Sequence, residues 1–293
     1  NDTMELFMNK FWKCTGFILF FAAGLLIVLY PTLSSKWNER RFQELVTEYD
    51  VNAADENRDF SDEIKKVQDY NAILKGSEVP DAFSIRENVA DPKYEELMNI
   101  NNNGIMGSIE IPVIDVKLPI YHYTRDEVLE KGVGHLFGSS LPVGGESTHC
   151  VLSAHRGLPN AKMFTDLDLL REGDVFYLKV FNDTLAYEVD QILKVEPQET
   201  SSLAIEEGKD YVTLVTCTPY AVNTHRLLVR GHRIPYEEEV YREAAEHSEP
   251  RFGSSLWIHV LCALAGVVLA VFMCWLLPGI LKKRQDKNHG SAA

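Results

Sequence analysis

The sequence predicts a mainly β protein, a closed barrel or a sandwich, with helices before it and an apolar segment near each end of the chain. From Gly104 to about Tyr236, short runs rich in Val, Ile, Tyr, Phe and Thr alternate with Gly, Pro, Asn and Asp. This texture is typical of strands separated by turns. Residues 104–236 are therefore expected to form one β domain, with a single helical candidate near Lys162 to Leu170.

The two apolar segments cover residues 15–33 and 254–280. The first has no charged residue over about 19 positions, close to the roughly 20 needed to cross a bilayer. It is longer than the apolar part of a typical signal peptide and no A-x-A site follows, which favours an uncleaved signal anchor. The second has no charge apart from the titratable His259 and carries tryptophans at both margins. Both segments are predicted to be transmembrane helices.

Basic residues outside the two segments predict their orientation. Four follow the second segment and two precede the first: Lys282, Lys283, Arg284 and Lys287, and Lys10 and Lys13. Because short basic flanks stay on the cytoplasmic side, residues 1–14 and the basic tail 281–293 are both expected in the cytoplasm. The expected localisation is a two-pass protein of the cell membrane, with everything between the spans outside the cell.

The charge balance limits the possible partners of this outer part. The chain has a net charge of −14, of which residues 36–278 carry −17, residues 279–293 carry +3 and residues 1–35 none. So acidic a surface repels phosphate backbones and anionic lipids. Nucleic acid is therefore not an expected partner, and a polar or cationic partner is favoured.

Three connecting segments flank the predicted β domain. Residues 34–75 are dense in charge, with apolar residues recurring every three or four positions, which predicts a helical stalk or cap. Residues 76–103 contain two prolines and a run of asparagines without sustained periodicity, which indicates a functional loop or a linker. Residues 237–253 form an acidic juxtamembrane segment.

Only two of the five cysteines, Cys150 and Cys217, lie away from the apolar segments. They could form one disulfide, although a secreted fold held by disulfides would contain more cysteines at framework spacings. The chain has no C-x-x-C motif, no Cys/His cluster at zinc spacing and no compact carboxylate cluster typical of calcium sites. No metal and no cofactor are predicted.

Cys217 ends the β-rich run TLVTC and is followed by Thr218-Pro219, where a strand would stop because proline lacks an amide donor. A cysteine at a strand end is accessible at the rim of a barrel. Taken alone, Cys217 also fits a packing role, because free cysteine is among the most buried residue types. As a nucleophile it would need a general acid or base and a cation or donor for an oxyanion.

Candidates for both helpers are present. His155, in SAHRG, follows another β-type run, and five other histidines compete with it: His122, His135, His149, His225 and His232. Arg226 begins RLLVRG, next to His225. Since neighbouring strand residues point to opposite faces, at most one of His225 and Arg226 faces Cys217, and alternation does not decide which.

Together, SAHRG around His155, TLVTCTPY around Cys217 and NTHRLLVRG around Arg226 closely resemble the sortase family, the cysteine transpeptidases of Gram-positive cell envelopes. The resemblance extends from about Ile105 to Tyr236. The form CTPYxxNTHRLLVRG and a C-terminal span are similar to class C, the pilus-polymerising sortases. The resemblance implies a closed sortase-type β-barrel of about eight strands, with Cys217, His155 and Arg226 at one rim.

The resemblance also implies the reaction. Cys217 would attack the Thr–Gly carbonyl of an LPXTG-like sorting signal and form a thioacyl enzyme, while His155 protonates the leaving amine and Arg226 holds the substrate and its oxyanion. A lysine amine of a neighbouring pilin would then form an isopeptide bond. The implied partners are pilin subunits and the cell membrane.

Many class C enzymes cover the site with a lid that carries Asp-Pro-aromatic. The best counterpart here is Asp81-Ala82-Phe83, with alanine in place of proline; Asp91-Pro92-Lys93 keeps the proline but lacks the aromatic residue. The resemblance implies Asp81 near Arg226 and Phe83 over Cys217, with a plain exposed linker as the alternative.

Two other functions fit parts of the sequence. A housekeeping-type sortase would attach surface proteins to peptidoglycan, but the C-terminal span and the long segment before the barrel favour pilus assembly. A membrane-tethered scaffold would leave Cys217 structural. A papain-like protease is disfavoured, because its cysteine precedes its histidine in the chain.

Overall fold

The fold was analysed in a computed structural model that describes residues 2–54, 58–74, 79–83, 90–247 and 265–266. Two compact units are present: residues 35–252 form one, and residues 1–34 with 253–293 form the other. The expected second span, 254–280, lies outside the described residues except for 265–266, and the basic tail 281–293 lies wholly outside them. The expected first span, 15–33, lies within the first helix.

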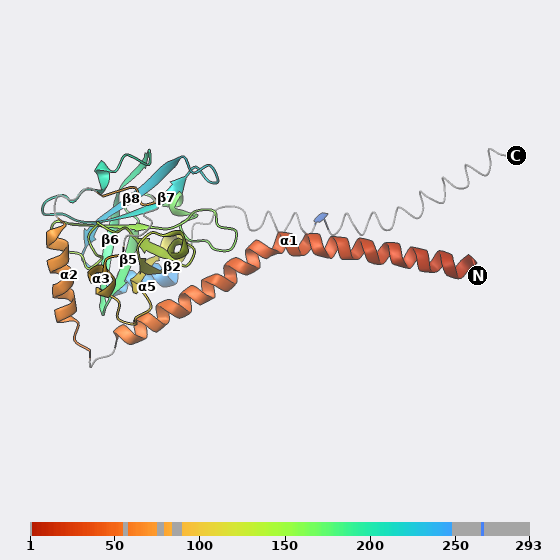
Figure 1. Ribbon diagram of the computed structural model, residues 1–293, viewed down its shortest axis with the longest axis horizontal. Coiled ribbons are helices and arrows are strands. Elements are labelled where there is room, and N and C mark those ends of the chain that lie inside the picture. Colours follow the sequence, from red (N-terminus) through yellow and green to blue (C-terminus); the bar gives the residue numbers. More distant parts are fainter. Residues whose placement is uncertain (1, 55–57, 75–78, 84–89, 248–264, 267–293) are drawn as a thin grey trace. The chain divides into compact units, whose positions relative to one another are not determined.

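The chain begins with three helices and continues through eight strands that carry short helical turns between them (Figure 1). The helices are α1 Asp2–Ala53, α2 Ser61–Ile73, α3 Pro92–Glu96, α4 Asp126–Leu129 and α5 Glu238–His247, and the 3₁₀ turns are η1 Pro112–Ile114, η2 Leu167–Leu169 and η3 Ser201–Leu203. The strands are β1 Ile105–Ile111, β2 Val116–His122, β3 Val133–His135, β4 Thr148–Ser153, β5 Val175–Val180, β6 Asp183–Val195, β7 Asp210–Thr218 and β8 His225–Ile234. Among the described residues, no helix combines the length and the apolar character needed to cross a membrane.

The eight strands close into a barrel in the order β1-β2-β3-β4-β7-β8-β6-β5, which confirms the predicted mainly β, closed fold with helices before it. The β2–β3 and β4–β7 pairs are parallel, and the other pairs are antiparallel. Alternation along β7 gives the barrel two faces. Val212 and Leu214 belong to the interior core, whereas Val215 belongs to a separate apolar cluster on the outer face.

The second half of α1 packs on the barrel through residues spaced three or four apart, as an amphipathic helix should. Its buried side chains are Phe42, Val46, Tyr49 and Ala53. The Tyr49 hydroxyl donates to the Met106 carbonyl at 2.9 Å and accepts from the Phe181 amide at 2.9 Å. These bonds join α1 to β1 and to the turn after β5.

The prediction of a helix near Lys162 to Leu170 is wrong. The segment forms turns and the short η2 instead. Met163 has a positive φ of 43°, which interrupts a right-handed helix, and the Phe164 amide donates to the His155 carbonyl rather than to a helical partner. Tertiary packing explains the difference, because Met163, Phe164 and Leu167 are all buried in the barrel core.

Candidate active site

The strand register brings the segments of the three predicted catalytic residues to one rim of the barrel. Cys217 on β7 lies directly opposite Arg226 on β8. β4 runs parallel to β7, with Ser153 beside Val215, so His155 leaves the sheet next to the end of β7. Thr216 Oγ1 donates to the Ala154 carbonyl at 2.8 Å, which ties these two strand ends together.

Arg226, and not His225, faces the thiol. Arg226 Nη1 lies 3.5 Å from Cys217 Sγ as a hydrogen-bond donor. His225 is exposed, and its Nδ1 pairs with the Thr224 hydroxyl at 2.9 Å. The choice that strand alternation left open is therefore decided by tertiary contacts, and Arg226 places a fixed positive charge and N–H donors beside Cys217.

Residues 79–83, which we name the cover segment, lie over this rim. Asp81 accepts two hydrogen bonds from Arg226, at 2.8 Å from Nε and 2.9 Å from Nη2. The Phe83 ring lies 5.0 Å from the Arg226 guanidinium carbon, and its centroid is 6.0 Å from that of the His155 ring. The cover segment is thus not a plain exposed linker: Asp81 is at Arg226, and Phe83 lies against both Arg226 and His155.

Apolar packing also holds the cover segment. Val79 and Ala82 are 5% and 1% exposed, respectively. They belong to the apolar cluster on the outer face of the barrel, which also contains Leu136, Val151, Leu203, Val215 and Leu228. Burying a valine side chain contributes about 1.5–3 kcal/mol, so this packing favours the closed arrangement independently of the ion pair.

The chain is anchored on both sides of the cover segment. Before it, the Asn71 side chain accepts from the Leu141 amide at 2.8 Å and donates to the Leu141 carbonyl at 3.1 Å. After it, Asp91 caps α3 by accepting from the amides of Lys93 and Tyr94. The Tyr94 hydroxyl bonds His135 Nδ1 at 2.7 Å. Asp91-Pro92-Lys93, the second candidate lid motif, therefore starts a helix and does not contact Arg226.

Electrostatics favour the neutral forms of Cys217 and His155 beside the Arg226–Asp81 ion pair. Burial raises the pKa of the Cys217 thiol, the Arg226 charge opposes this rise, and the Asp81 carboxylate adds to it. Burial lowers the pKa of His155, against the opposing charges of Asp126 and Glu130. At neutral pH both shifts favour a thiol and a neutral imidazole.

The other histidines and the second cysteine have local structural partners or lie elsewhere. Buried His122, His135 and His149 bond backbone carbonyls of Leu97, Ser140 and Ala204. Cys150 is buried inside the barrel, and both it and Cys217 are free, so the possible disulfide does not form. Within the described residues, no cluster of three or more His, Cys, Asp or Glu could hold a metal ion.

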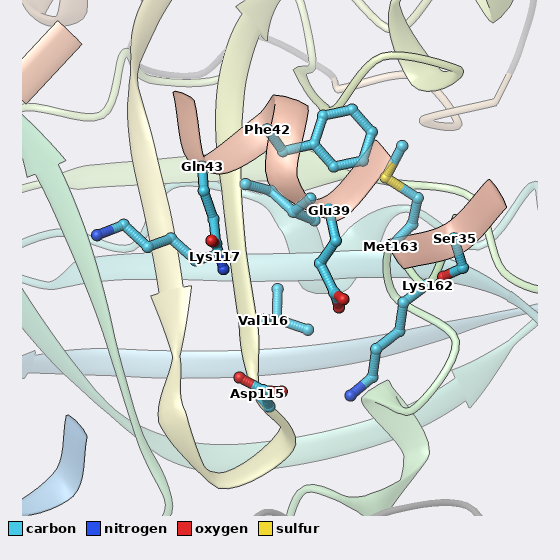
Figure 2. A pocket seen from close by; sticks show the side chains of 10 residues that line it. Ser35, Glu39, Phe42, Gln43, Asp115, Val116, Lys117, Lys162 and Met163 are labelled. Atoms are coloured by element: carbon cyan, nitrogen blue, oxygen red, sulfur yellow. The ribbon is translucent and has the colours of Figure 1, made fainter. Parts of the chain in front are cut away.

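A cavity of about 100 Å³ lies away from this rim, between α1, the start of β2 and residues 162–163 (Figure 2). Figure 2 shows Glu39 from α1 pointing into it, with Asp115 and Lys162 at its edge. Burial raises the pKa of Glu39, and Asp115 adds to the rise. None of the five predicted site residues lines this cavity, so it is a gap between α1 and the barrel.

Two residues at the site were not singled out by the sequence analysis. Thr216 and Arg156 bond Ala154 and Thr218, respectively, each across 62 positions of sequence. Their place in the motifs TLVTC and SAHRG is the only sequence signal. Which partners they find depends on the β4–β7 register.

Comparisons with known proteins agree with this geometry. The family model described as the sortase domain matches residues 109–234. Solved structures similar to the chain include sortase C-1 from Actinomyces oris, with 47% sequence identity and a TM-score of 0.58, over 60% of this chain and 98% of that one. Another is sortase C-1 from Streptococcus pneumoniae, with 46% identity and a TM-score of 0.61, over 66% of this chain and 100% of that one.

Among curated proteins, the chain is 32% identical to sortase D of Bacillus subtilis (strain 168) over 131 residues. This match covers 44% of the chain and 63% of the relative. The chain therefore spans less than two thirds of that relative's length. The matched region corresponds in size to the barrel and not to the flanking segments.

Proposed function

The chain belongs to the sortase family and within it to class C, and on this premise we propose that it is a membrane-anchored cysteine transpeptidase that polymerises pilin subunits. The observation that carries the proposal is the meeting of Cys217, Arg226 and the His155 segment at one barrel rim, with Arg226 Nη1 3.5 Å from the thiol sulfur. A thiol, a titratable imidazole and a fixed cation are the groups that acyl transfer through a thioester requires.

In the first half of the proposed reaction, Cys217 Sγ attacks the threonine carbonyl carbon of an LPXTG-like signal. His155, neutral at rest, takes the proton of the thiol as the C–S bond forms, and it gives this proton to the departing amine when the C–N bond to glycine breaks. Arg226 stabilises the oxygen that becomes negative in the tetrahedral intermediate. This step requires the cover segment to leave, because Asp81 occupies two of the N–H groups of Arg226.

In the second half, the neutral amine of a pilin lysine attacks the thioester carbonyl. The new C–N bond is an isopeptide bond, the C–S bond breaks, and the proton released by the amine passes through His155 to the Cys217 sulfur. Each half returns the proton that the other used, so the enzyme needs no cofactor for the cycle.

We also propose that residues 15–33 and 254–280 anchor the protein in the cell membrane, with the barrel outside and both termini in the cytoplasm. Large apolar side chains of α1 support the first anchor, because Phe20 and Ile27 are 79% and 74% exposed, respectively. Contiguous exposed apolar surface of this kind is expected to face lipid or a partner. The basic flanks support the orientation.

The test is to incubate the protein with purified candidate pilins that carry an LPXTG-like signal, and separately with a peptidoglycan-stem mimic. The proposal predicts pilin polymers with an isopeptide bond to lysine, mapped by mass spectrometry, and none with Cys217→Ala. Transfer to the stem mimic in preference to pilin would favour the housekeeping alternative. No product and no thioacyl adduct with the wild-type protein, together with an intact phenotype in Cys217→Ala, would favour the scaffold.

A further inference from the structure

Arg156, the residue after His155, is a buried cation that the proposed reaction does not use. Its side chain is 9% exposed. Arg156 Nη2 donates to Asp168 Oδ2 at 2.5 Å, and Nη1 donates to Thr218 Oγ1 at 3.4 Å. The guanidinium carbon also lies 5.9 Å from the centroid of the Tyr220 ring. Arg156 thus contacts η2, the last residue of β7 and Tyr220 in the β7–β8 connection.

The Arg156–Thr218 bond has a counterpart on the other side of His155 and Cys217. Thr216, just before Cys217, bonds Ala154, just before His155. Arg156, just after His155, bonds Thr218, just after Cys217. Side-chain bonds between the β4 end and the β7 end therefore flank the positions of His155 and Cys217 on both sides.

The backbone ladder does not supply the second of these links. The last register pair of β4 with β7 is Ser153 with Val215, and the Ala154 amide still reaches the Val215 carbonyl at 3.2 Å. Beyond this point β4 has ended, so the position of His155 relative to Cys217 depends on side chains. Misplacing a reacting group by about 1 Å can cost on the order of 100-fold in rate.

The turn after His155 and the connection after Cys217 are also packed closely together. Gly157 has a φ of +80°, and a Cβ placed on it would lie 2.9 Å from the Tyr220 ring. Only glycine fits both this backbone conformation and this contact. Tyr220 therefore covers the turn that Arg156 begins.

We propose that Arg156 is a positioning residue that holds His155 in register with Cys217 through its bonds to Thr218 and Asp168. The inference rests on the proposed function, because it takes His155 and Cys217 as the reacting pair. Arginine suits the task because its planar fork bonds two acceptors in different directions, whereas lysine presents one compact charge. Arg156 Nε is buried without a hydrogen-bond partner, so desolvation of this group is incompletely offset.

The test compares Arg156→Met, Arg156→Lys and Thr218→Val with a matched control, Arg233→Met. Arg233 is also an arginine paired with a carboxylate, Asp210 at 3.9 Å, and close to a tyrosine ring, Tyr187 at 5.5 Å. It lies near the other end of β8, seven positions after Arg226, the residue opposite Cys217. The measurements are kcat and KM for a fluorogenic LPXTG-like peptide, the pH profile of kcat/KM, the thermal midpoint, and the pH dependence of Cys217 alkylation by iodoacetamide.

Arg156→Met is expected to lower kcat by about 10–100-fold with little change in KM, and to shift the pH profile, because His155 no longer faces the thiol in the reacting geometry. Arg156→Lys should recover part of the loss. Thr218→Val, which keeps the shape and replaces the hydroxyl with a methyl group, should show a smaller loss in the same direction. Arg233→Met should change the thermal midpoint only.

The inference is overturned if Arg156→Met and Thr218→Val lower the thermal midpoint as Arg233→Met does but leave kcat and both pH profiles unchanged. Should Arg156→Met not fold, Arg156→Lys and Thr218→Val decide by the same criteria. Failure of the proposed function gives a different result: the wild-type protein does not cleave the peptide. Alkylation still tests the inference in that case, with a shifted profile supporting it and an unshifted profile overturning it.

Discussion

Arg226 and Arg230 lie four residues apart on β8 and make nearly the same kinds of contact, but the two sets of contacts have different roles. Arg226 bonds Asp81 at 2.8 and 2.9 Å and lies 5.0 Å from the Phe83 ring. Arg230 bonds Asp190 at 3.0 and 3.1 Å and lies 4.1 Å from the Tyr211 ring. In each case a carboxylate holds the guanidinium in a fork and an aromatic ring lies beside it.

The difference lies in where the carboxylate comes from. Asp190 is part of β6, the strand that is hydrogen-bonded to β8, so its pair with Arg230 belongs to the barrel. Asp81 belongs to the cover segment, 145 residues before Arg226, and can leave without breaking a β-strand pair. The same kind of ion pair is therefore structural when both partners lie in one sheet, and exchangeable when one partner comes from a connecting segment.

The largest expected effect is the difference in activity between replacing Arg226 and replacing Arg230. Arg226→Ala should lower kcat/KM for an LPXTG-like peptide by about 100–1000-fold, because the oxyanion loses its charged donor. Arg230→Ala should instead lower the free energy of unfolding by about 1–3 kcal/mol, because the Asp190 carboxylate loses its partner. Peptide cleavage and chemical denaturation of both variants measure this contrast. Equal losses of activity would show that both pairs serve the site.

A smaller effect, on the pKa of Cys217, is expected from neutralising Asp81, the carboxylate that binds Arg226. Because the Asp81 charge raises the pKa of Cys217, Asp81→Asn should lower that pKa and move the pH dependence of alkylation to lower pH. Each unit of such a shift multiplies the thiolate fraction about tenfold at a pH well below the pKa. Asp190→Asn serves as the matched control and should leave the alkylation profile in place. A profile that does not move with Asp81→Asn contradicts a closed cover segment.

The smallest expected effect is a change in the alkylation rate of Cys217 when the Phe83 ring beside Arg226 is removed. Phe83→Ala should speed alkylation of Cys217 several-fold at fixed pH, because the ring lies against both Arg226 and His155 and excludes water from the rim. Tyr211→Ala removes the ring beside Arg230 and should leave the alkylation rate unchanged. The rates are measured by labelling with iodoacetamide and intact-mass detection. Unchanged rates in Phe83→Ala would mean that the ring does not cover the thiol.

The β domain could be predicted from sequence because its signal is local. Val, Ile, Tyr and Thr favour the pleated, half-buried positions of a sheet, and turn residues separate the runs. The helical pattern at 162–170 failed because burial of Met163, Phe164 and Leu167 in the barrel core outweighs local propensity. Local pattern thus predicted the strands and misjudged a segment whose conformation is decided by packing.

The candidate site, too, could be predicted only in part from local sequence, because some of its contacts depend on tertiary structure. The ends of two β-rich runs place Cys217 and His155 at a barrel rim, but their motifs' resemblance to sortases, and not this position, singled them out as catalytic. The choice between His225 and Arg226 could not be made from alternation, since it depends on the Cys217–Arg226 pairing and on Asp81. The bond of Arg156 to Thr218 spans 62 positions and arises only when β4 and β7 pair.

Intact-mass spectrometry of the protein mixed with an LPXTG-like peptide tests most directly whether Cys217 is the nucleophile of a transpeptidase. We expect a mass increase equal to the peptide acyl group, located at Cys217, removed by hydroxylamine as a thioester should be, and absent from Cys217→Ala. An adduct that persists in Cys217→Ala, or no adduct with a sorting signal even in Asp81→Asn, would contradict the role of Cys217 as the nucleophile.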